Sequence, residues 1–195
     1  MRPRTWLVSL AVVCSHQLTA QPAKISQVRQ DLLDPFHGAA AECLELAKAI
    51  PEDKYGWRPM DGARSFGEVF AHMAGSTLLF GSYAGMKQPD GPARALATVY
   101  MKRGFEMPEI FEAERAIKGK AQTVAIMEEA FLRAEDLIRQ MPDSELDKQV
   151  KFFGQTITVH ALLIRLGDHL SEHLGQAIAY ARVNRIVPPW SRQDR

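Results

Sequence analysis

Apolar residues recur along four stretches of the chain at the spacing of three and four residues that marks one face of an α-helix. The first stretch runs from about Ile25 to Ile50, and the second begins at Ser65. The third spans about Gln122 to Gln140, and the last runs from Val159 to about Arg185. Four amphipathic helices of this length can bury one shared core, so the pattern predicts an all-α fold, a four-helix bundle.

Two of these helices begin with recognisable capping residues. Ser65 is followed three residues later by Glu68, which is the pattern of a capping box. Thr158 stands directly before the last helix and can cap it in the same way. Pro35 lies inside the first helix, and we expect Asp34 to cap a fresh helical start at that point.

The connections are less regular than the helices. Between residues 85 and 119 the stretch MKQPDGPA predicts a loop, and ALATVYMKRGFEMPEIFEAERAI predicts short helices without clear boundaries. The stretch DKQVKFFGQTITV before the last helix is expected to be extended in part.

Composition limits the classes of partner. The chain has 195 residues and 46% hydrophobic content, which suits one domain with a full core. Its 24 Lys and Arg residues nearly balance its 23 Asp and Glu residues, so there is no charge excess to attract nucleic acid or an anionic membrane surface.

Residues 1–20 have the order of regions found in a secretory signal peptide. Arg2 and Arg4 precede an apolar run from Trp6 to Cys14, and a polar stretch then closes on Ala20. The run is too short to cross a bilayer, which takes about 20 residues. We therefore expect cleavage after Ala20, export to the periplasm or the extracellular space, and a mature single domain of residues 21–195 without a membrane span.

Removal of the signal peptide would leave Cys43 as the last cysteine of the chain, so no internal disulfide is expected. Cys43 repeats with apolar neighbours along the first helix. We expect it to be a buried structural thiol rather than a nucleophile.

Two histidines, His169 and His173, stand four residues apart on the apolar stripe of the last helix. At that spacing the Cβ atoms are about 5–6 Å apart, so both imidazoles can converge on one cation. The alternative is that each ring is a neutral core residue satisfied by a hydrogen bond. From these two residues alone, both interpretations stay open.

His72 favours the metal interpretation because it lies on the inner side of the second helix, one step of three after Val69. Three imidazoles can hold a divalent cation and leave coordination positions for water or substrate. Zn²⁺ or Ni²⁺ is the expected ion, with Fe or Mn as alternatives that also accept imidazole. His37 and His160 are expected to have surface or structural roles.

Glu172 precedes His173 and flanks the histidine stripe. It is our candidate catalytic residue, either as a general base or as a hydrogen-bond partner of an imidazole. The alternative is an exposed carboxylate or an ion pair with Arg165 or Arg182.

Three separated motifs carry a family resemblance: AIPEDKYGWRP at 49–59, RSFGEVFAHMAGS at 64–76 and GDHLSEHLGQAIAYARVNRIVPPWS at 167–191. In this order they resemble the DinB (DinB/YfiT-like) family of metal-dependent enzymes, over roughly residues 25–191. The resemblance implies an up-and-down four-helix bundle with unusual connections. It also implies a divalent metal site formed by His72, His169 and His173.

The resemblance says less about the reaction. Related bundles act as thiol transferases or thiol-dependent isomerases, although a reduced thiol is scarce outside the cytoplasm. We expect a metal-dependent hydrolase or transferase that acts on a small molecule. The alternative is a non-catalytic module that binds a metal or small ligand, and a homodimer is the expected assembly if the chain associates.

Overall fold

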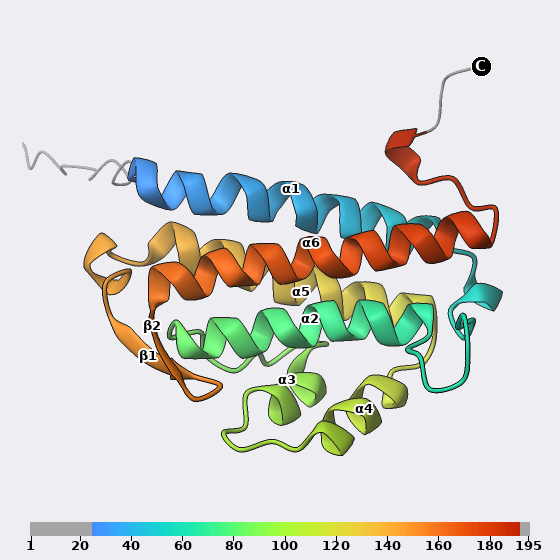
Figure 1. The fold of residues 1–195 in the computed structure, drawn as a ribbon, viewed down its shortest axis with the longest axis horizontal. Helices are drawn as coiled ribbons and strands as arrows, with labels where there is room; N and C mark the ends of the chain where they lie inside the picture. Colours follow the sequence, from blue (N-terminus) through green and yellow to red (C-terminus); the bar gives the residue numbers. More distant parts are fainter. Residues whose placement is uncertain (1–24, 192–195) are drawn as a thin grey trace, which may run out of the picture.

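Four long helices form a bundle in the computed structural model, which describes residues 25–191 (Figure 1). They are α1 (Gln27–Ala49), α2 (Phe66–Tyr83), α5 (Gly119–Gln140) and α6 (Val159–Val183). Helices α1 and α2 each pack against both α5 and α6. The predicted all-α bundle is therefore confirmed, while the predicted signal peptide lies outside the described residues.

The connections give the bundle its topology. Two shorter helices, α3 (Arg94–Tyr100) and α4 (Met107–Ala116), carry the chain back along the bundle, so that α5 runs parallel to α2 (Figure 1). Two short 3₁₀ helices lie in the connections, η1 (Glu52–Lys54) and η2 (Asp143–Glu145), and a third, η3 (Pro189–Ser191), follows α6. Within residues 25–191, no helix combines the length and the apolar character needed for a membrane span.

A hairpin precedes α6, where the sequence predicted partly extended chain. Strands β1 (Gln149–Phe152) and β2 (Gln155–Thr158) pair antiparallel, with Gln149 opposite Thr158 and Phe152 opposite Gln155. Only Phe153 and Gly154 connect them, so the hairpin closes in a two-residue turn.

The predicted caps of α2 and α6 are both present. Ser65 Oγ accepts a hydrogen bond from the Glu68 backbone N–H at 3.3 Å, and Glu68 accepts one from the Ser65 backbone N–H at 2.8 Å. Thr158 Oγ1 accepts from the Ala161 N–H at 3.1 Å. These bonds satisfy N–H groups that a helix start leaves free, and they fix where α2 and α6 begin.

The predicted fresh start of the first helix at Asp34 is wrong, because α1 continues through Pro35. Proline has no N–H and removes one hydrogen bond to the carbonyl of Asp31. Asp31 and Pro35 are both exposed, so water can solvate that carbonyl. Asp34 instead accepts a hydrogen bond from the Gln30 side chain at 2.5 Å.

The third long helix begins three residues earlier than predicted, at Gly119 rather than Gln122. Its first turn is capped from a distant part of the chain, because the Glu52 carboxylate in η1 accepts the Lys120 N–H at 3.0 Å. A tertiary cap of this kind leaves no local signal in the sequence.

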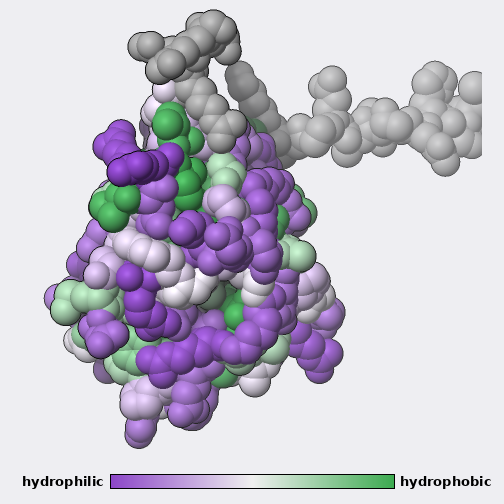
Figure 2. Space-filling model, turned by 90° about the vertical axis from the view of Figure 1, so that its right-hand side faces the viewer, coloured by the Kyte–Doolittle hydropathy of each residue, from purple (hydrophilic) through white to green (hydrophobic). Residues whose placement is uncertain are grey.

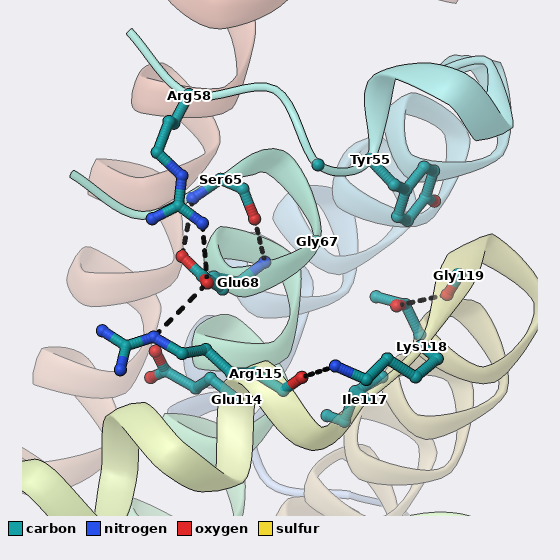
Figure 3. A pocket seen from close by; sticks show the side chains of 12 residues that line it. Tyr55, Arg58, Ser65, Gly67, Glu68, Glu114, Arg115, Ile117, Lys118 and Gly119 are labelled. Atoms are coloured by element: carbon teal, nitrogen blue, oxygen red, sulfur yellow. Dashed lines mark hydrogen bonds and ion pairs between the residues drawn. The ribbon is translucent and has the colours of Figure 1, made fainter. Parts of the chain in front are cut away.

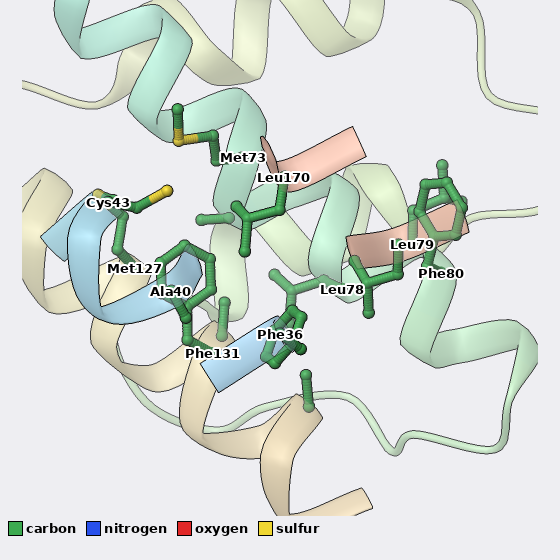
Figure 4. Packing of buried hydrophobic residues seen from close by; sticks show 14 of the residues in the cluster. Phe36, Ala40, Cys43, Met73, Leu78, Leu79, Phe80, Met127, Phe131 and Leu170 are labelled. Carbon is green, nitrogen blue, oxygen red and sulfur yellow. The ribbon is translucent and has the colours of Figure 1, made fainter. Parts of the chain in front are cut away.

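The core lies between the four long helices (Figure 4). Phe36 of α1 and Phe131 of α5 meet edge to face, with ring centroids 6.2 Å apart. Cys43 is fully buried, as predicted, and burial raises the pKa of its thiol. At the end of the bundle where α2 and α5 begin, by contrast, the surface is mostly hydrophilic (Figure 2).

Candidate metal centre

The structure brings the three predicted histidines together between α2 and α6. One ligand atom from each of His72, His169 and His173 lies within 4.8 Å of the others. The Nε2 atoms of His72 and His169 are 3.3 Å apart. The ring centroid of His173 lies 4.6 Å from that of His72 and 4.5 Å from that of His169. All three side chains are half-buried.

Their positions follow from the local structure of two helices. The capping box at Ser65 fixes the start of α2, and His72 lies two turns further along that helix. His169 and His173 are one turn apart on α6, as their spacing predicted. The ring of Phe80 lies beside that of His169, with centroids 5.8 Å apart, so the cluster adjoins the apolar core.

A buried carboxylate from α4 contacts His72 on the side of the ring that faces away from the other two histidines. Glu114 has no exposed side-chain surface, and its Oε1 atom lies 2.9 Å from His72 Nδ1. Arg64 donates two hydrogen bonds to the same carboxylate, at 2.7 and 3.1 Å. The Tyr100 hydroxyl donates a further one at 2.5 Å.

Gly75 makes room for this arrangement. A Cβ atom at position 75 would stand only 2.3 Å from the ring of Tyr100. The missing side chain therefore lets Tyr100 lie directly against α2, where its hydroxyl reaches both His72 Nδ1 and Glu114.

The charge of Glu114 fixes the tautomer of His72. Burial alone raises the pKa of this carboxyl, but hydrogen bonds from His72, Arg64 and Tyr100 outweigh burial and hold the pKa below its usual range. An ionised carboxylate can only accept, so His72 Nδ1 carries the proton. In the neutral ring, the lone pair of Nε2 then faces the other two histidines.

His173 is oriented in the same way by a neutral partner. Its Nδ1 atom lies 2.8 Å from the Gln176 side-chain oxygen, and Gln176 in turn donates to the Tyr180 hydroxyl at 3.0 Å. Since an amide oxygen only accepts, Nδ1 of His173 carries the proton and Nε2 has the lone pair.

Burial keeps the rings on α6 neutral. Burial is the main cause that lowers the pKa of His169 to about 3, and the neighbouring His173 and His72 lower it further. The pKa of His173 is also lowered, chiefly by burial, although its hydrogen bond to Gln176 acts in the opposite direction. Neutral imidazole is the form that binds a metal ion.

The donor set fits a divalent cation. Two nitrogens that each lie about 2.0–2.1 Å from a tetrahedral zinc ion stand roughly 3.3–3.4 Å apart. The separation of 3.3 Å between the Nε2 atoms of His72 and His169 agrees with this value. A cation would also resolve the contact of two imidazole nitrogens, which needs a shared proton or a shared ion.

A cavity of 190 Å³ opens beside the cluster, and His72 and His169 are part of its wall. Ser76, one turn after His72 on α2, also lines it, and its Oγ lies 3.1 Å from His169 Nε2. The remainder of the wall is formed mainly by apolar side chains. The histidines can therefore act on a molecule bound in this cavity.

A second cavity, of 230 Å³, lies near the start of α2, and Glu114 borders it (Figure 3). Three of its charged groups pair with one another, because Arg58 and Arg115 contact the Glu68 carboxylate at 3.0 and 3.7 Å. It contains none of the three histidines.

Glu172 is exposed on α6 beside His173. None of the ion pairs among residues 25–191 includes Glu172, while Arg165 donates to the Gln155 side chain. Its negative charge acts on His173, where it raises the pKa as one of the smaller causes. The role of Glu172 as a general base stays a prediction.

Sequence reasoning missed Ser76, Tyr100, Glu114 and Arg64. Ser76 could have been found, because it follows His72 by four residues on the same helix. Tyr100 and Glu114 lie in the segment with weak periodicity, on helices whose boundaries could not be assigned. No sequence signal brings that segment to His72.

Comparisons with known proteins agree with this fold. A family model for the DinB superfamily matches residues 36–177. A solved DinB-like protein (YjoA) from Bacillus subtilis is 17% identical with a TM-score of 0.60, over 84% of this chain and 99% of that one. A DinB-like protein from Bacillus cereus ATCC 10987 is 16% identical with a TM-score of 0.56, over 82% and 95%. A search of curated proteins gave no significant match. Since the family match spans most of the chain, the protein belongs to the DinB superfamily.

Proposed function

We propose that the protein is a metal-dependent enzyme, a hydrolase or transferase, that acts on a small molecule. In this proposal His72, His169 and His173 hold a divalent cation, with Zn²⁺ or Ni²⁺ as the first candidates. One observation carries the proposal: two of the three imidazoles, His72 and His169, also form part of the wall of the 190 Å³ cavity. An ion held by them would adjoin bound substrate, whereas a purely structural site would be closed.

The residues around the site support this role. A bound divalent cation would supply a Lewis acid, and it would lower the pKa of bound water or bind a thiolate. Glu114 accepts a hydrogen bond from Nδ1 of His72 and so orients that ring. Ser76 offers a hydroxyl 3.1 Å from His169 Nε2, where it can donate a hydrogen bond to a polar substrate group.

We further propose that the enzyme works outside the cytoplasm, because residues 1–20 have the composition of a signal peptide. In an oxidising compartment a reduced thiol is scarce, so a transfer reaction there would need another group donor. Hydrolysis needs only water.

The test is a substrate screen on metal-loaded protein purified without a polyhistidine tag. The panel contains p-nitrophenyl esters for hydrolysis, and an electrophile with a low-molecular-weight thiol for transfer. We expect turnover that is lost after chelation, restored by added metal and absent in His169→Leu. Glu172→Gln tests the predicted general base, and it should lower kcat with little change in metal content.

A metal-loaded protein that turns over no member of the panel would contradict the enzymatic proposal in these two classes. It would favour the alternative, a module that binds metal or a small ligand without catalysis. Turnover that persists unchanged after full removal of the metal would contradict the role given to the histidines.

A further inference from the structure

The cavity beside the histidines has polar groups at one end and apolar side chains elsewhere. His72, Ser76 and His169 supply ring nitrogens and a hydroxyl, while the hydroxyl of Tyr100 is engaged by Glu114. The other residues that line it are all apolar: Leu79, Phe80, Phe105, Met107, Ile110 and Phe153. A ligand that fits this wall has an apolar body and one polar end.

The volume of the cavity limits the size of the apolar part of the ligand. A volume of 190 Å³ is only slightly larger than the roughly 150 Å³ of an apolar protein cavity that stays dry and binds benzene. The cavity is smaller than the roughly 300–1,000 Å³ of sites for drug-sized ligands. One six-membered ring, or an acyl group of similar volume, therefore fills it.

The rim of the cavity, formed by Phe105, Met107 and Phe153, exposes apolar side chains from separate segments. Met107 is 49% exposed at the start of α4, and Phe153 is 69% exposed in the hairpin turn. The rings of Phe105 and Phe153 face each other edge to face at 6.1 Å. Large apolar side chains that gather at the mouth of a cavity are typical of a ligand-binding surface.

The backbone of Phe153 gives independent support. Its φ is 45°, and that of Gly154 is 78°, so both residues of the two-residue turn have positive φ. Asn or Asp followed by Gly is strongly preferred in such a turn, and phenylalanine is unfavourable there. A strained, exposed aromatic residue at a cavity mouth points to a role in binding.

We propose that this cavity binds a monocyclic aromatic group, or an apolar group of equal size, of a substrate whose polar end meets His72, Ser76 and His169. Phe153 is the specificity-determining residue at the rim. The inference rests on the proposed function for the polar end, while the fit of the apolar group depends on the cavity alone.

Two hydroxamates test the assignment in the zinc-loaded protein. Benzohydroxamate and acetohydroxamate share one metal-binding group and differ in the phenyl ring. We expect benzohydroxamate to bind at least tenfold more tightly, as measured by calorimetry. Toluene tests the cavity without a metal, because saturable shifts of the Leu79 and Ile110 methyl NMR signals in chelator-treated protein would report its binding.

Variants at the rim separate binding from stability. Phe153→Gly should reduce the preference for benzohydroxamate at least threefold. Its melting temperature should change little, since glycine accepts positive φ and this gain offsets the lost ring contacts with Phe105 and Phe152. Met107→Ala should reduce the same preference without altering the turn. Leu132→Ala is the matched control, because Leu132 is an exposed apolar residue on α5 outside the cavity, and it should leave the preference unchanged.

Equal affinity for the two hydroxamates together with no toluene binding would overturn the inference, even if zinc binds to the histidines. Toluene binding in a protein that fails to bind zinc would support the apolar site and overturn the proposed metalloenzyme instead. A preference for the phenyl ring that survives both rim variants would overturn the role given to Phe153.

Discussion

Replacing Glu114 by glutamine is the most informative single change beside the proposed metal site. The buried carboxylate accepts two hydrogen bonds from Arg64, one from Tyr100 and one from His72. Glutamine has nearly the same shape, but it carries no charge and has one oxygen in place of two. It therefore leaves the Arg64 guanidinium without its counter-charge and offers His72 Nδ1 a weaker acceptor.

The expected cost follows from the burial of the pair. Breaking a buried ion pair by removing one partner costs about 3–5 kcal/mol, and we expect the lower end, roughly 3 kcal/mol, because water can reach part of Arg64. The Arg64 side chain is 19% exposed, whereas that of Glu114 is fully buried. A metal-binding histidine usually donates a hydrogen bond from its other ring nitrogen, and loss of that acceptor typically lowers metal affinity about 10–100-fold. We expect a decrease of this size in the zinc affinity of Glu114→Gln.

Two assays separate these effects. Urea unfolding in the presence of chelator gives the stability of the metal-free protein, and competition with a chromophoric chelator gives zinc affinity. Glu112→Gln is the control, because Glu112 is exposed on the same helix and should change neither quantity appreciably. Wild-type zinc affinity in a folded Glu114→Gln variant would refute the role assigned to this carboxylate.

Three further predictions concern the cap of α2, the pKa of His169 in the metal-free protein and the signal peptide. Ser65→Ala should lower the free energy of unfolding by ~1 kcal/mol through loss of the cap, and a change near zero would show that α2 does not depend on it. In the metal-free protein, the pKa of His169 is about 3, whereas in the unfolded chain it is ~6.5. The unfolded chain thus takes up a proton that the folded chain does not, so stability is full above pH 7 and falls between pH 6.5 and 3. Urea midpoints measured at pH 8, 6 and 5 in the presence of chelator report this loss of stability. The midpoint should fall less with pH in His169→Leu than in the wild type, and an equal fall in both would contradict the lowered pKa of His169. Mass spectrometry of the native protein should find a chain that begins at Gln21, and an intact Met1 in a cytoplasmic fraction would contradict export.

Much of the fold was predictable because its signals are local. Residues close together in the sequence determine the caps at Ser65 and Thr158. They also determine the apolar stripe of α6 that carries His169 and His173. Helix spacing alone placed those two rings on one face. The same reasoning put His72 on the inner side of another helix, and the structure brings it to the other two.

What could not be predicted depends on contacts between distant segments. Glu52 caps α5 from 68 residues away, and Glu114 reaches His72 across 42 residues of chain. A fresh helical start was expected at Pro35, but buried residues on both sides of it and the exposed position of Asp31 allow α1 to continue. Phe153 lies in a segment that was expected to be extended in part, and only the folded structure shows that it lines the cavity.

Metal content and thermal unfolding of the untagged protein, with and without chelator, decide whether the three histidines form one metal site. We expect about one zinc or nickel ion per chain, and a melting temperature that chelator lowers in the wild type. His72→Leu, His169→Leu and His173→Leu should each lose the metal and its effect on melting, whereas His160→Leu, on the same helix as two of the ligands, should keep both. A wild-type melting curve that chelator leaves unchanged, together with leucine variants that retain the same metal content, would contradict the site.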